Sequence, residues 1–593
     1  MRRAFIAAIL CLAMSDAFAK TVPPGRSVED IITRVADDIP GPVVTQASRK
    51  RPLSVIMQQA QVPGVSVAVF VDGRLAWSKA WGVRTQGQPA AVTPETIFQA
   101  ASISKPVTAL AVMALVADGR LALDREVSHA IDGWAASKPI TLRQLLSHSA
   151  GLNVSGFDGY PALAAVPSPL QILRGDAPAN TPLVVVESTP GVSFNYSGGG
   201  YTVVQMIVAQ AEGRSFAETM AERVLKPLAM TESTFDQPLP VPLKDRSASG
   251  HRGGKPIKGG SNIYPELAAA GLWTTPSDLG RVAVDIQKAR RGIPSAVASP
   301  AIARDMLTPQ RGGYGLGFEL KTREGEPVFE HAGLNEGFEA RLVASASATG
   351  PQYVVVVMTN GRGGTAIADG VIRAVARQYA WKAFAPRSVR EVSLSSKRLT
   401  ALVGFYRSSG PSIGIEQSGN VLHVRDDGWR PARMIAVSPS RFVVDDRPGV
   451  YQFGVDAKTG ARTLSIADGG TSVTFVRAQR LIDQSFAGRA FLRGTMNDWQ
   501  MTKPLRLTAP DTLEVTIALT AGRHEFKIGD AEWREVNLGA RLGPSLTALG
   551  ASVPLSPMGG NLSFETASKG RFRFAVETAQ AQNPKLTVTR AAE

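Results

Sequence analysis

The stretch FQAASISKPVTAL, residues 98–110, is the part of the sequence on which the interpretation of this chain depends. It combines a serine at position 102 with a lysine at position 105, and the apolar run from Val107 to Val116 predicts a helix. Because Ser102 and Lys105 are three residues apart, a helix places both side chains on one face. A serine hydroxyl becomes a nucleophile when a base removes its proton and positive charge supports the alkoxide. The spacing therefore predicts a lysine-assisted nucleophile.

Two further segments follow in order and strengthen this interpretation: FNYSGGGY at residues 194–201 and EHAGL at residues 330–334. Between them lie ITLRQLLSHSAGL at residues 140–152 and AGLW at residues 270–273. Together these segments resemble those of secreted serine hydrolases of the penicillin-binding protein and class C β-lactamase group. The resemblance implies an α+β domain of the β-lactamase/transpeptidase type, in which an antiparallel sheet is flanked by helices.

The same resemblance implies catalytic roles for four residues. Ser102 is expected to attack a carbonyl carbon, and Lys105 and Tyr196 are expected to move its proton. His331 is expected to supply a polar or cationic wall beside the substrate. An acyl-enzyme would form on Ser102 and would then be hydrolysed, with no cofactor.

Substrate contacts are expected from the backbone of the third segment and from the start of the helix after Tyr196. The amides of Ser102 and Leu334 would form an oxyanion hole, and the small Gly333 would let the substrate lie along the strand edge. Gly198 stands where the group usually carries an asparagine that holds the amide of a β-lactam or peptide. That departure, and His331 in place of a lysine, favour an ester or a D-amino-acid peptide over efficient β-lactam hydrolysis.

Other candidate residues are not expected to be catalytic. His148 follows a predicted helix end and is expected to be structural, and KTG at residues 458–460 is typical of a hairpin turn. The sequence GPSIG at residues 410–414 matches a nucleophile elbow, but no predicted helix follows it. The six histidines show no ligand spacing, so no metal site is predicted.

The chain is long enough for several domains, and its pattern changes along its length. The serine hydrolase domain is predicted at residues 20–385, where a hairpin turns at Asp72-Gly73. Short strands with turn residues follow, and LVGFY at residues 402–406 resembles the opening of lipocalin-like β domains, here at 390–480. Residues 484–593 resemble the immunoglobulin-like sandwich that binds glycogen or starch in several enzymes.

In that C-terminal segment, Trp499, Lys527 and Trp533 match sugar-contacting positions of the glycogen-binding relatives. Indole rings stack on the apolar faces of sugars, and a lysine can bond to hydroxyl groups. The opposing interpretation is that the tryptophans only fill the core of the sandwich. A polysaccharide partner is therefore an expectation carried by the resemblance.

The first residues predict export. Two arginines, an apolar run and the small residues of Ala17-Phe18-Ala19 are typical of a signal peptide at residues 1–19, with cleavage near Ala19 and a periplasmic or secreted product. The only cysteine, Cys11, lies inside this segment, so a thiol enzyme is excluded. No later run is long enough for a membrane span. The net charge of +15 is scattered rather than clustered, so no nucleic-acid partner is expected.

The sequence as a whole predicts an exported serine hydrolase that acts through an acyl-enzyme on an ester, a D-amino-acid peptide or a β-lactam-like amide. The alternative is a non-catalytic envelope protein that keeps the penicillin-binding fold as a scaffold and binds glycan through its C-terminal sandwich. Retention of Ser102, Lys105 and Tyr196 together argues for the enzyme.

Overall fold

The computed structural model describes residues 23, 25–408, 412–425, 431–445, 447–468, 471–479, 481–533, 535–540, 545–580 and 583–591. The predicted signal peptide and its cleavage site lie outside these residues. The chain divides into two compact units, one of residues up to Pro40 with Arg49–Pro386, the other of Gly41–Ser48 with the rest of the chain from Arg387.

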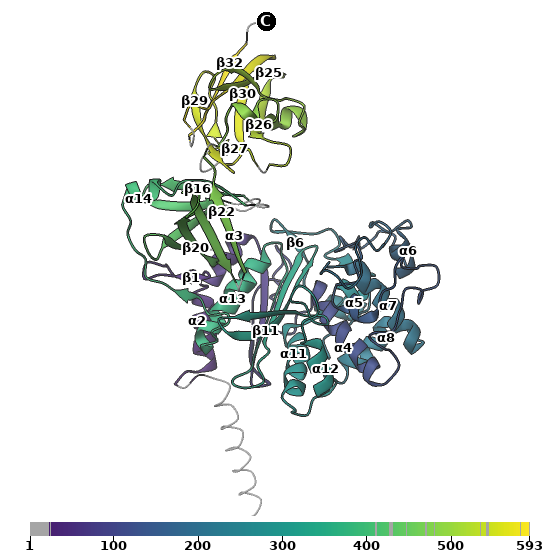
Figure 1. Ribbon diagram of the computed structural model, residues 1–593. Helices are drawn as coiled ribbons and strands as arrows, with labels where there is room; N and C mark the ends of the chain where they lie inside the picture. Colours follow the sequence, from purple (N-terminus) through teal and green to yellow (C-terminus); the bar gives the residue numbers. More distant parts are fainter. Residues whose placement is uncertain are drawn as a thin grey trace, which may run out of the picture. The chain divides into compact units, whose positions relative to one another are not determined.

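A six-stranded antiparallel sheet forms the centre of the first unit (Figure 1). The predicted hairpin at Asp72-Gly73 is present as its last two strands, and residues 353–359 form a strand rich in buried valines, as the sequence indicated. The strand order is β10 (Glu319–Arg323), β11 (Glu326–Asn335), β12 (Phe338–Ser345), β13 (Tyr353–Thr359), β2 (Gly64–Val71) and β3 (Arg74–Gly82).

Alternate residues of this sheet face two separate cores, because successive side chains of a strand point to opposite faces. Ala68 and Phe70 of β2 join the larger core with the helices at 104–117, 198–212 and 276–290. Val67 and Val69 join the smaller core with the helices at 28–37, 53–60 and 364–379. The helices of this unit are α2 (Val28–Asp37), α3 (Leu53–Ala60), α4 (Ser104–Ala117), α5 (Leu142–Leu146), α6 (Pro169–Arg174), α7 (Gly198–Glu212), α8 (Phe216–Met220), α9 (Val241–Lys244), α10 (Leu267–Ala270), α11 (Pro276–Arg290), α12 (Pro300–Met306) and α13 (Gly364–Tyr379).

Short elements complete the first unit. The single-turn helices are η1 (Ala101–Ile103) and η2 (Ala221–Leu225), and the two-residue strand pairs are β4 (Phe98–Gln99) with β9 (Trp273–Thr274), β5 (Tyr160–Pro161) with β8 (Asn262–Ile263), and β6 (His251–Arg252) with β7 (Lys255–Pro256).

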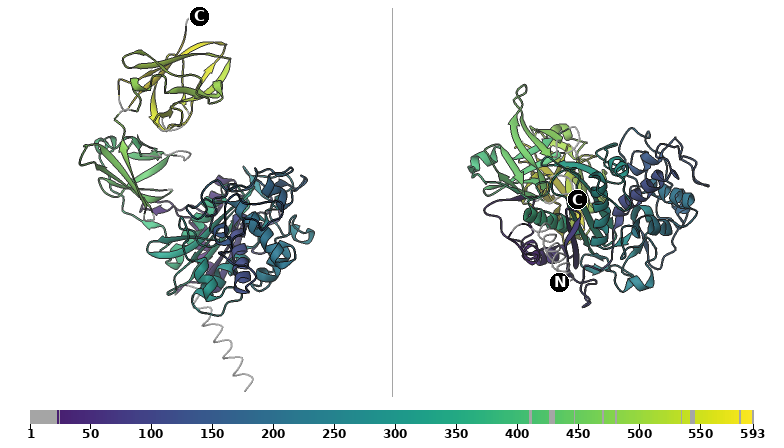
Figure 2. Two further views of the ribbon diagram at one scale, coloured as in Figure 1. Left: turned by 45° about the vertical axis from the view of Figure 1, so that its right-hand side comes forward. Right: turned by 90° about the horizontal axis from the view of Figure 1, so that it is seen from below.

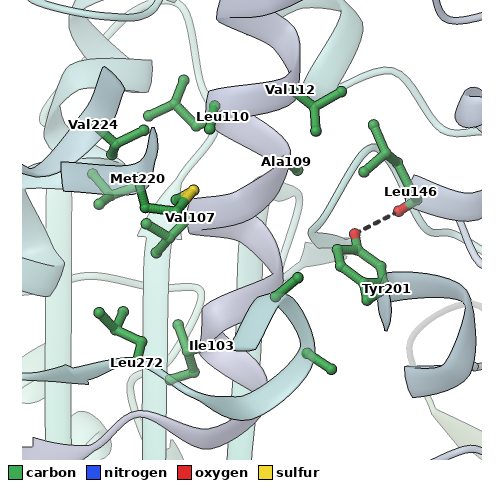
Figure 3. Close-up of a cluster of buried hydrophobic side chains, with 14 of the residues drawn as sticks. Ile103, Val107, Ala109, Leu110, Val112, Leu146, Tyr201, Met220, Val224 and Leu272 are labelled. Atoms are coloured by element: carbon green, nitrogen blue, oxygen red, sulfur yellow. Dashed lines mark hydrogen bonds between the residues drawn. The ribbon is translucent and has the colours of Figure 1, made fainter. Parts of the chain in front are cut away.

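Helix α4 passes through the larger core and is almost wholly buried. Its apolar side chains pack among residues of α7, η2 and the segment after α10, and the Tyr201 hydroxyl donates to the Leu146 carbonyl at 2.9 Å (Figure 3). A helix buried on all sides has no solvent face to maintain, so its run of valine, alanine and leucine needs no polar stripe. This packing fixes the N-terminal end of α4, which carries Lys105, and the turn η1 directly before it, which carries Ser102.

The second unit begins with the two-residue parallel pair β1 (Val43–Val44) and β14 (Arg387–Ser388), α14 (Ser396–Thr400) and a closed eight-stranded antiparallel barrel, drawn in green in Figures 1 and 2. Inward side chains such as Ile415, Leu464 and Phe475 fill the barrel core. Its strands are β15 (Gly404–Arg407), β16 (Ser412–Ser418), β17 (Val421–Arg425), β18 (Ala432–Ala436), β19 (Arg441–Val444), β20 (Arg447–Val455), β21 (Arg462–Asp468) and β22 (Thr471–Arg477).

The remaining strands form a curled sheet around a third core that includes Phe526 and Phe574. Strand β29 pairs with β27 on one side and with β32 on the other, so the strands form one continuous sheet around this core. The elements are η3 (Gln484–Phe486), β23 (Phe491–Gly494), η4 (Thr495–Asn497), β24 (Arg506–Ala509), β25 (Thr512–Leu519), β26 (Gly522–Gly529), β27 (Asn537–Ala540), β28 (Ser545–Leu546), β29 (Ser552–Pro557), β30 (Leu562–Thr566), β31 (Gly570–Glu577) and β32 (Lys585–Arg590).

The predicted fold class, an α+β domain followed by all-β domains, is confirmed. The two motifs that were not expected to be catalytic, at 410–414 and 458–460, belong to the barrel. Ser412 is the first residue of strand β16 and no helix follows it, and residues 458–460 form the turn between β20 and β21. Within the described residues, no helix is both long and apolar enough to cross a membrane.

Candidate active site

Ser102 lies in the single turn η1, directly before α4, and Lys105 is the second residue of that helix. The Lys105 Nζ donates a hydrogen bond to the Ser102 Oγ at 3.0 Å, so the two side chains share one face as their spacing indicates. Ala101, the residue before the serine, has a φ of 51°, which is strained for a residue with a Cβ. Helix packing therefore holds the serine at the end of a sharp turn.

Lys105 is 2% exposed, and its Nζ also donates to the Ala269 carbonyl of α10 at 2.9 Å. Both acceptors are neutral oxygens, so the ammonium is directed at the serine by two hydrogen bonds and by the surrounding core. A lysine in such a position can support an alkoxide or exchange a proton with it.

Glu266 lies immediately before α10, and its carboxyl is fully buried. Neither of its carboxyl oxygens has a hydrogen-bond partner within the described structure. Burial raises the pKa of Glu266 to about 8, because the charged form loses its hydration. The backbone amides of Ala269 and Ala270 donate to the Glu266 carbonyl, so this residue adjoins the turn that orients Lys105.

Tyr196 lies two residues before α7 and comes beside Lys105, whose Nζ is 4.9 Å from the centre of the tyrosine ring. The ring is half-buried. Its other neighbours are His148, at 4.2 Å between ring centres, and His331, at 6.4 Å. The structure thus brings together Ser102, Lys105, Tyr196 and His331, the four residues predicted to act on the substrate.

His331 lies in the middle of β11 and is 5% exposed. Its Nδ1 donates to the Ala332 carbonyl at 2.6 Å, which leaves Nε2 as an acceptor, and this buried atom has no partner within the described structure. Burial, and after it the positive charge of Lys105, lower the pKa of His331 to about 3. Of the polar and cationic roles expected for it, the neutral polar role fits this environment.

Gly333 allows β11 to approach the turn that carries the serine. A Cβ at this position would lie 2.1 Å from the Ala100 carbonyl oxygen, closer than any real contact. The backbone of Leu334 is therefore next to η1, as an oxyanion hole shared with Ser102 requires. Asn335 secures this approach, since its Nδ2 donates to the Gln99 side chain at 2.8 Å.

Gly198 begins α7, and the space in front of its Cα is occupied by an aromatic ring. A Cβ built on Gly198 would lie 2.6 Å from the Cε2 atom of Phe157, which is half-buried against the larger core. The loop before Phe157 is fixed by the amides of Gly198 and Gly199, which donate to the carbonyls of Ser155 and Val154. An apolar ring therefore fills the space into which a side chain at position 198 would extend.

The three residues predicted to contact sugars gather around Arg493 of β23. The guanidinium of Arg493 lies 4.2 Å from the centre of the Trp533 ring, and the Lys527 Nζ lies 5.3 Å from it. The Arg493 Nε also donates to the Trp499 carbonyl at 2.7 Å. Both tryptophans are half-buried and both have positive φ, 62° at Trp499 and 58° at Trp533.

Two residues near the site were not singled out from the sequence, and a third was not expected to lie in it. His148, predicted to be structural, stacks on Tyr196, and neither Phe157 nor Glu266 was singled out. The positions of His148 within the ordered motif at 140–152 and of Glu266 just before AGLW were available signals. No local pattern relates Phe157 to Gly198, which lies 41 residues later.

Comparison with known proteins gives a family match, curated relatives and a solved structure. A family model described as Beta-lactamase matches residues 50–380. Penicillin-binding protein 4 of Amycolatopsis lactamdurans is 29% identical over 331 residues, covering 51% of this chain and 81% of that protein. Protein flp of Staphylococcus aureus (strain N315) is 26% identical over 230 residues, and the match spans 37% of this chain and 43% of that protein. The octameric penicillin-binding protein homologue from Pyrococcus abyssi has 20% identity and a TM-score of 0.47, covering 72% of this chain and 98% of that structure.

Proposed function

Because this chain belongs to the β-lactamase family, whose members are generally serine hydrolases, we propose that it is a serine acyl hydrolase with Ser102 as its nucleophile. One observation carries the proposal. The Ser102 Oγ lies 3.0 Å from the Nζ of a lysine that is 2% exposed and held by the core. Burying the Lys105 side chain with only neutral hydrogen-bond acceptors lowers the stability of the fold. Such a group is typical of a functional site, and activation of Ser102 is the function that its position supports.

The reaction proceeds in two halves. A proton leaves the Ser102 hydroxyl for the pair of Lys105 and Tyr196 while the Oγ bonds to the substrate carbonyl carbon. The bond to the leaving group breaks as that group takes the proton, which leaves an acyl-enzyme. Water then loses a proton to the same pair, attacks the acyl carbon, and releases the acid as the serine regains its hydrogen. The amides of Ser102 and Leu334 stabilise the oxyanion in both halves.

We propose a neutral ester as the preferred substrate, ahead of a D-amino-acid peptide and an efficiently hydrolysed β-lactam. The neutral His331 offers no positive charge to a substrate carboxylate. Phe157 takes the space in front of Gly198, so no side-chain amide is present there to bond a substrate amide. Leu334 and Phe194 are 51% and 39% exposed and add apolar surface.

The test is hydrolysis of a short-chain nitrophenyl ester, a D-amino-acid nitroanilide and a fluorescent penicillin by the full-length protein and by Ser102→Ala. The ester should be turned over fastest, and Ser102→Ala should lose at least about 10³-fold in kcat/KM on each substrate. Ser412→Ala, which alters the serine of the motif at residues 410–414, serves as the matched control and should keep full activity. Equal rates for the wild type and Ser102→Ala would refute the proposal.

A second proposed function is glycan binding by the C-terminal sandwich. The strained backbone at both Trp499 and Trp533 supports it, because such strain at bulky residues is concentrated at binding sites. Retention of the full-length protein on immobilised α-glucan should fall for Trp499→Ala and remain for Met501→Ala, an exposed neighbour. Absence of retention, or retention unaffected by Trp499→Ala, would contradict glycan binding. That result would also remove the support for the alternative in which the protein is a non-catalytic scaffold that binds glycan.

We further propose that the chain is exported and cleaved near Ala19. The basic start, apolar run and small-residue site at residues 1–19 support this. N-terminal sequencing of protein recovered from the periplasm or medium should begin at Lys20, whereas an intact N-terminus at Met1 in the cytoplasm would contradict export.

A further inference from the structure

His148 follows α5 and contacts the chain on both sides of Tyr196, although 47 residues separate the two in sequence. The His148 carbonyl accepts a hydrogen bond from the Asn195 amide at 2.7 Å. The His148 Nδ1 accepts another from the Ser197 amide at 3.0 Å. One residue therefore holds the backbone immediately before and immediately after the tyrosine.

The imidazole ring of His148 also packs on the tyrosine ring. The ring centres are 4.2 Å apart and the planes are inclined by 32°, so the two rings stack with a tilt. Tyr201 of α7 and Tyr314 enclose His148 from other sides, at 5.3 and 4.9 Å, and the residue is 2% exposed. These contacts leave the ring of Tyr196 little freedom to move toward or away from Lys105.

The arrangement requires a neutral imidazole, because Nδ1 can accept the Ser197 amide only when it carries no proton. Burial, and after it the positive charges of Lys105 and His331, hold the pKa of His148 well below its usual range. The titratable groups that face His148 are Lys105 of α4, Tyr201 of α7 and His331 of β11. Tyr196, two residues before α7, and Tyr314, between α12 and β10, face it as well. The backbone of His148 has a φ of 54°, a strained value that its hydrogen bonds maintain.

We propose that His148 is a positioning residue, which fixes the Tyr196 phenol beside Lys105 and Ser102. It does so by accepting hydrogen bonds from the backbone amides on both sides of the tyrosine and by stacking on its ring. The inference rests on the proposed function, in which Tyr196 carries the proton. A displacement of about 1 Å of a catalytic group can lower a rate by about 10²-fold without loss of substrate binding. Replacement of His148 should therefore lower the rate only while the Tyr196 hydroxyl is present.

The experiment is a double-mutant cycle between His148→Ala and Tyr196→Phe in the full-length protein, with ester hydrolysis as the readout. His148→Ala should lower kcat by about 10- to 100-fold with KM changed by less than about threefold. In the Tyr196→Phe background, the same change should cost less than about threefold, because the positioned hydroxyl is already absent. His129→Ala, at an exposed histidine, serves as the control and should leave kcat unchanged.

His148→Asn provides a second variant, and it keeps the cycle usable if His148→Ala does not fold. The Asn side-chain oxygen can accept the Ser197 amide, and asparagine tolerates a positive φ, but it lacks the ring. It should recover part of the lost kcat, and its remaining deficit should again disappear beside Tyr196→Phe. Equal losses in both backgrounds would overturn the positioning role. If Tyr196→Phe alone leaves kcat unchanged, the proposed function of Tyr196 fails instead, and the two failures are told apart.

Discussion

The buried carboxyl of Glu266 makes the stability of the hydrolase domain depend on pH, and Glu266→Gln should remove that dependence. Glu266 has a pKa of about 8 in the folded protein, against 4.5 for an ordinary glutamate. Below pH 4.5 both the folded and the unfolded chain carry the proton, so folding incurs no penalty. As the pH rises above 4.5, the unfolded chain ionises while the folded chain does not, and stability falls until the folded pKa is reached.

The size of the effect follows from the two pKa values. Each pH unit between them lowers the free energy of unfolding by about 1.4 kcal/mol, which gives about 3 kcal/mol between pH 5 and pH 7.5. The loss of about 3 kcal/mol is a large fraction of the stability of a typical domain. Because glutamine has nearly the same volume and does not titrate, Glu266→Gln should remove this slope whatever its effect at a single pH.

The measurement is urea unfolding of the full-length protein, followed by tryptophan fluorescence at pH 5 and pH 7.5. Groups other than Glu266 titrate alike in wild type and variant, so the difference between the two proteins at each pH isolates this carboxyl. Glu95→Gln, at an exposed position, is the matched control and should follow the wild type. Parallel loss of stability in the wild type and in Glu266→Gln would show that the carboxyl is ionised in the folded protein and would refute the reasoning.

Three further predictions concern the packing that holds the site. Lys105→Ala should lower kcat/KM for the ester by about 10³-fold, as measured by steady-state kinetics, since the serine then loses its partner at 3.0 Å; a loss below tenfold would contradict this role. Gly333→Ala should lower kcat by more than about 10²-fold, because its Cβ would lie 2.1 Å from the Ala100 carbonyl and β11 must move away from the serine; unchanged burst kinetics would argue against this. Tyr201→Phe should cost about 1 kcal/mol in urea unfolding, because one buried hydrogen bond to Leu146 is lost while the carbonyl keeps a backbone donor; no change in midpoint would disprove it.

Much of the fold could be read from local patterns. The hairpin at Asp72-Gly73 and the valines of β13 have strand signals that depend only on neighbouring residues. The helix predicted from Val107 begins earlier, at Ser104, because Pro106 is tolerated in the first turn of a helix. The partners of each strand depend on contacts between distant segments, which a local pattern does not contain.

The sequence by itself determined that Ser102 and Lys105 lie together, because helical geometry brings two side chains three residues apart onto one face wherever the helix lies. It also determined the order of the motifs that identify the family. Only the tertiary structure decided the state of the groups around the substrate. His331 is neutral, His148 grips Tyr196, and Phe157 fills the space before Gly198 because residues far away in the chain bury them. Burial and electrostatic environment arise from packing among distant segments, and so the contact between Ser102 and Lys105 was predictable from the sequence while the environment of the groups around it was not.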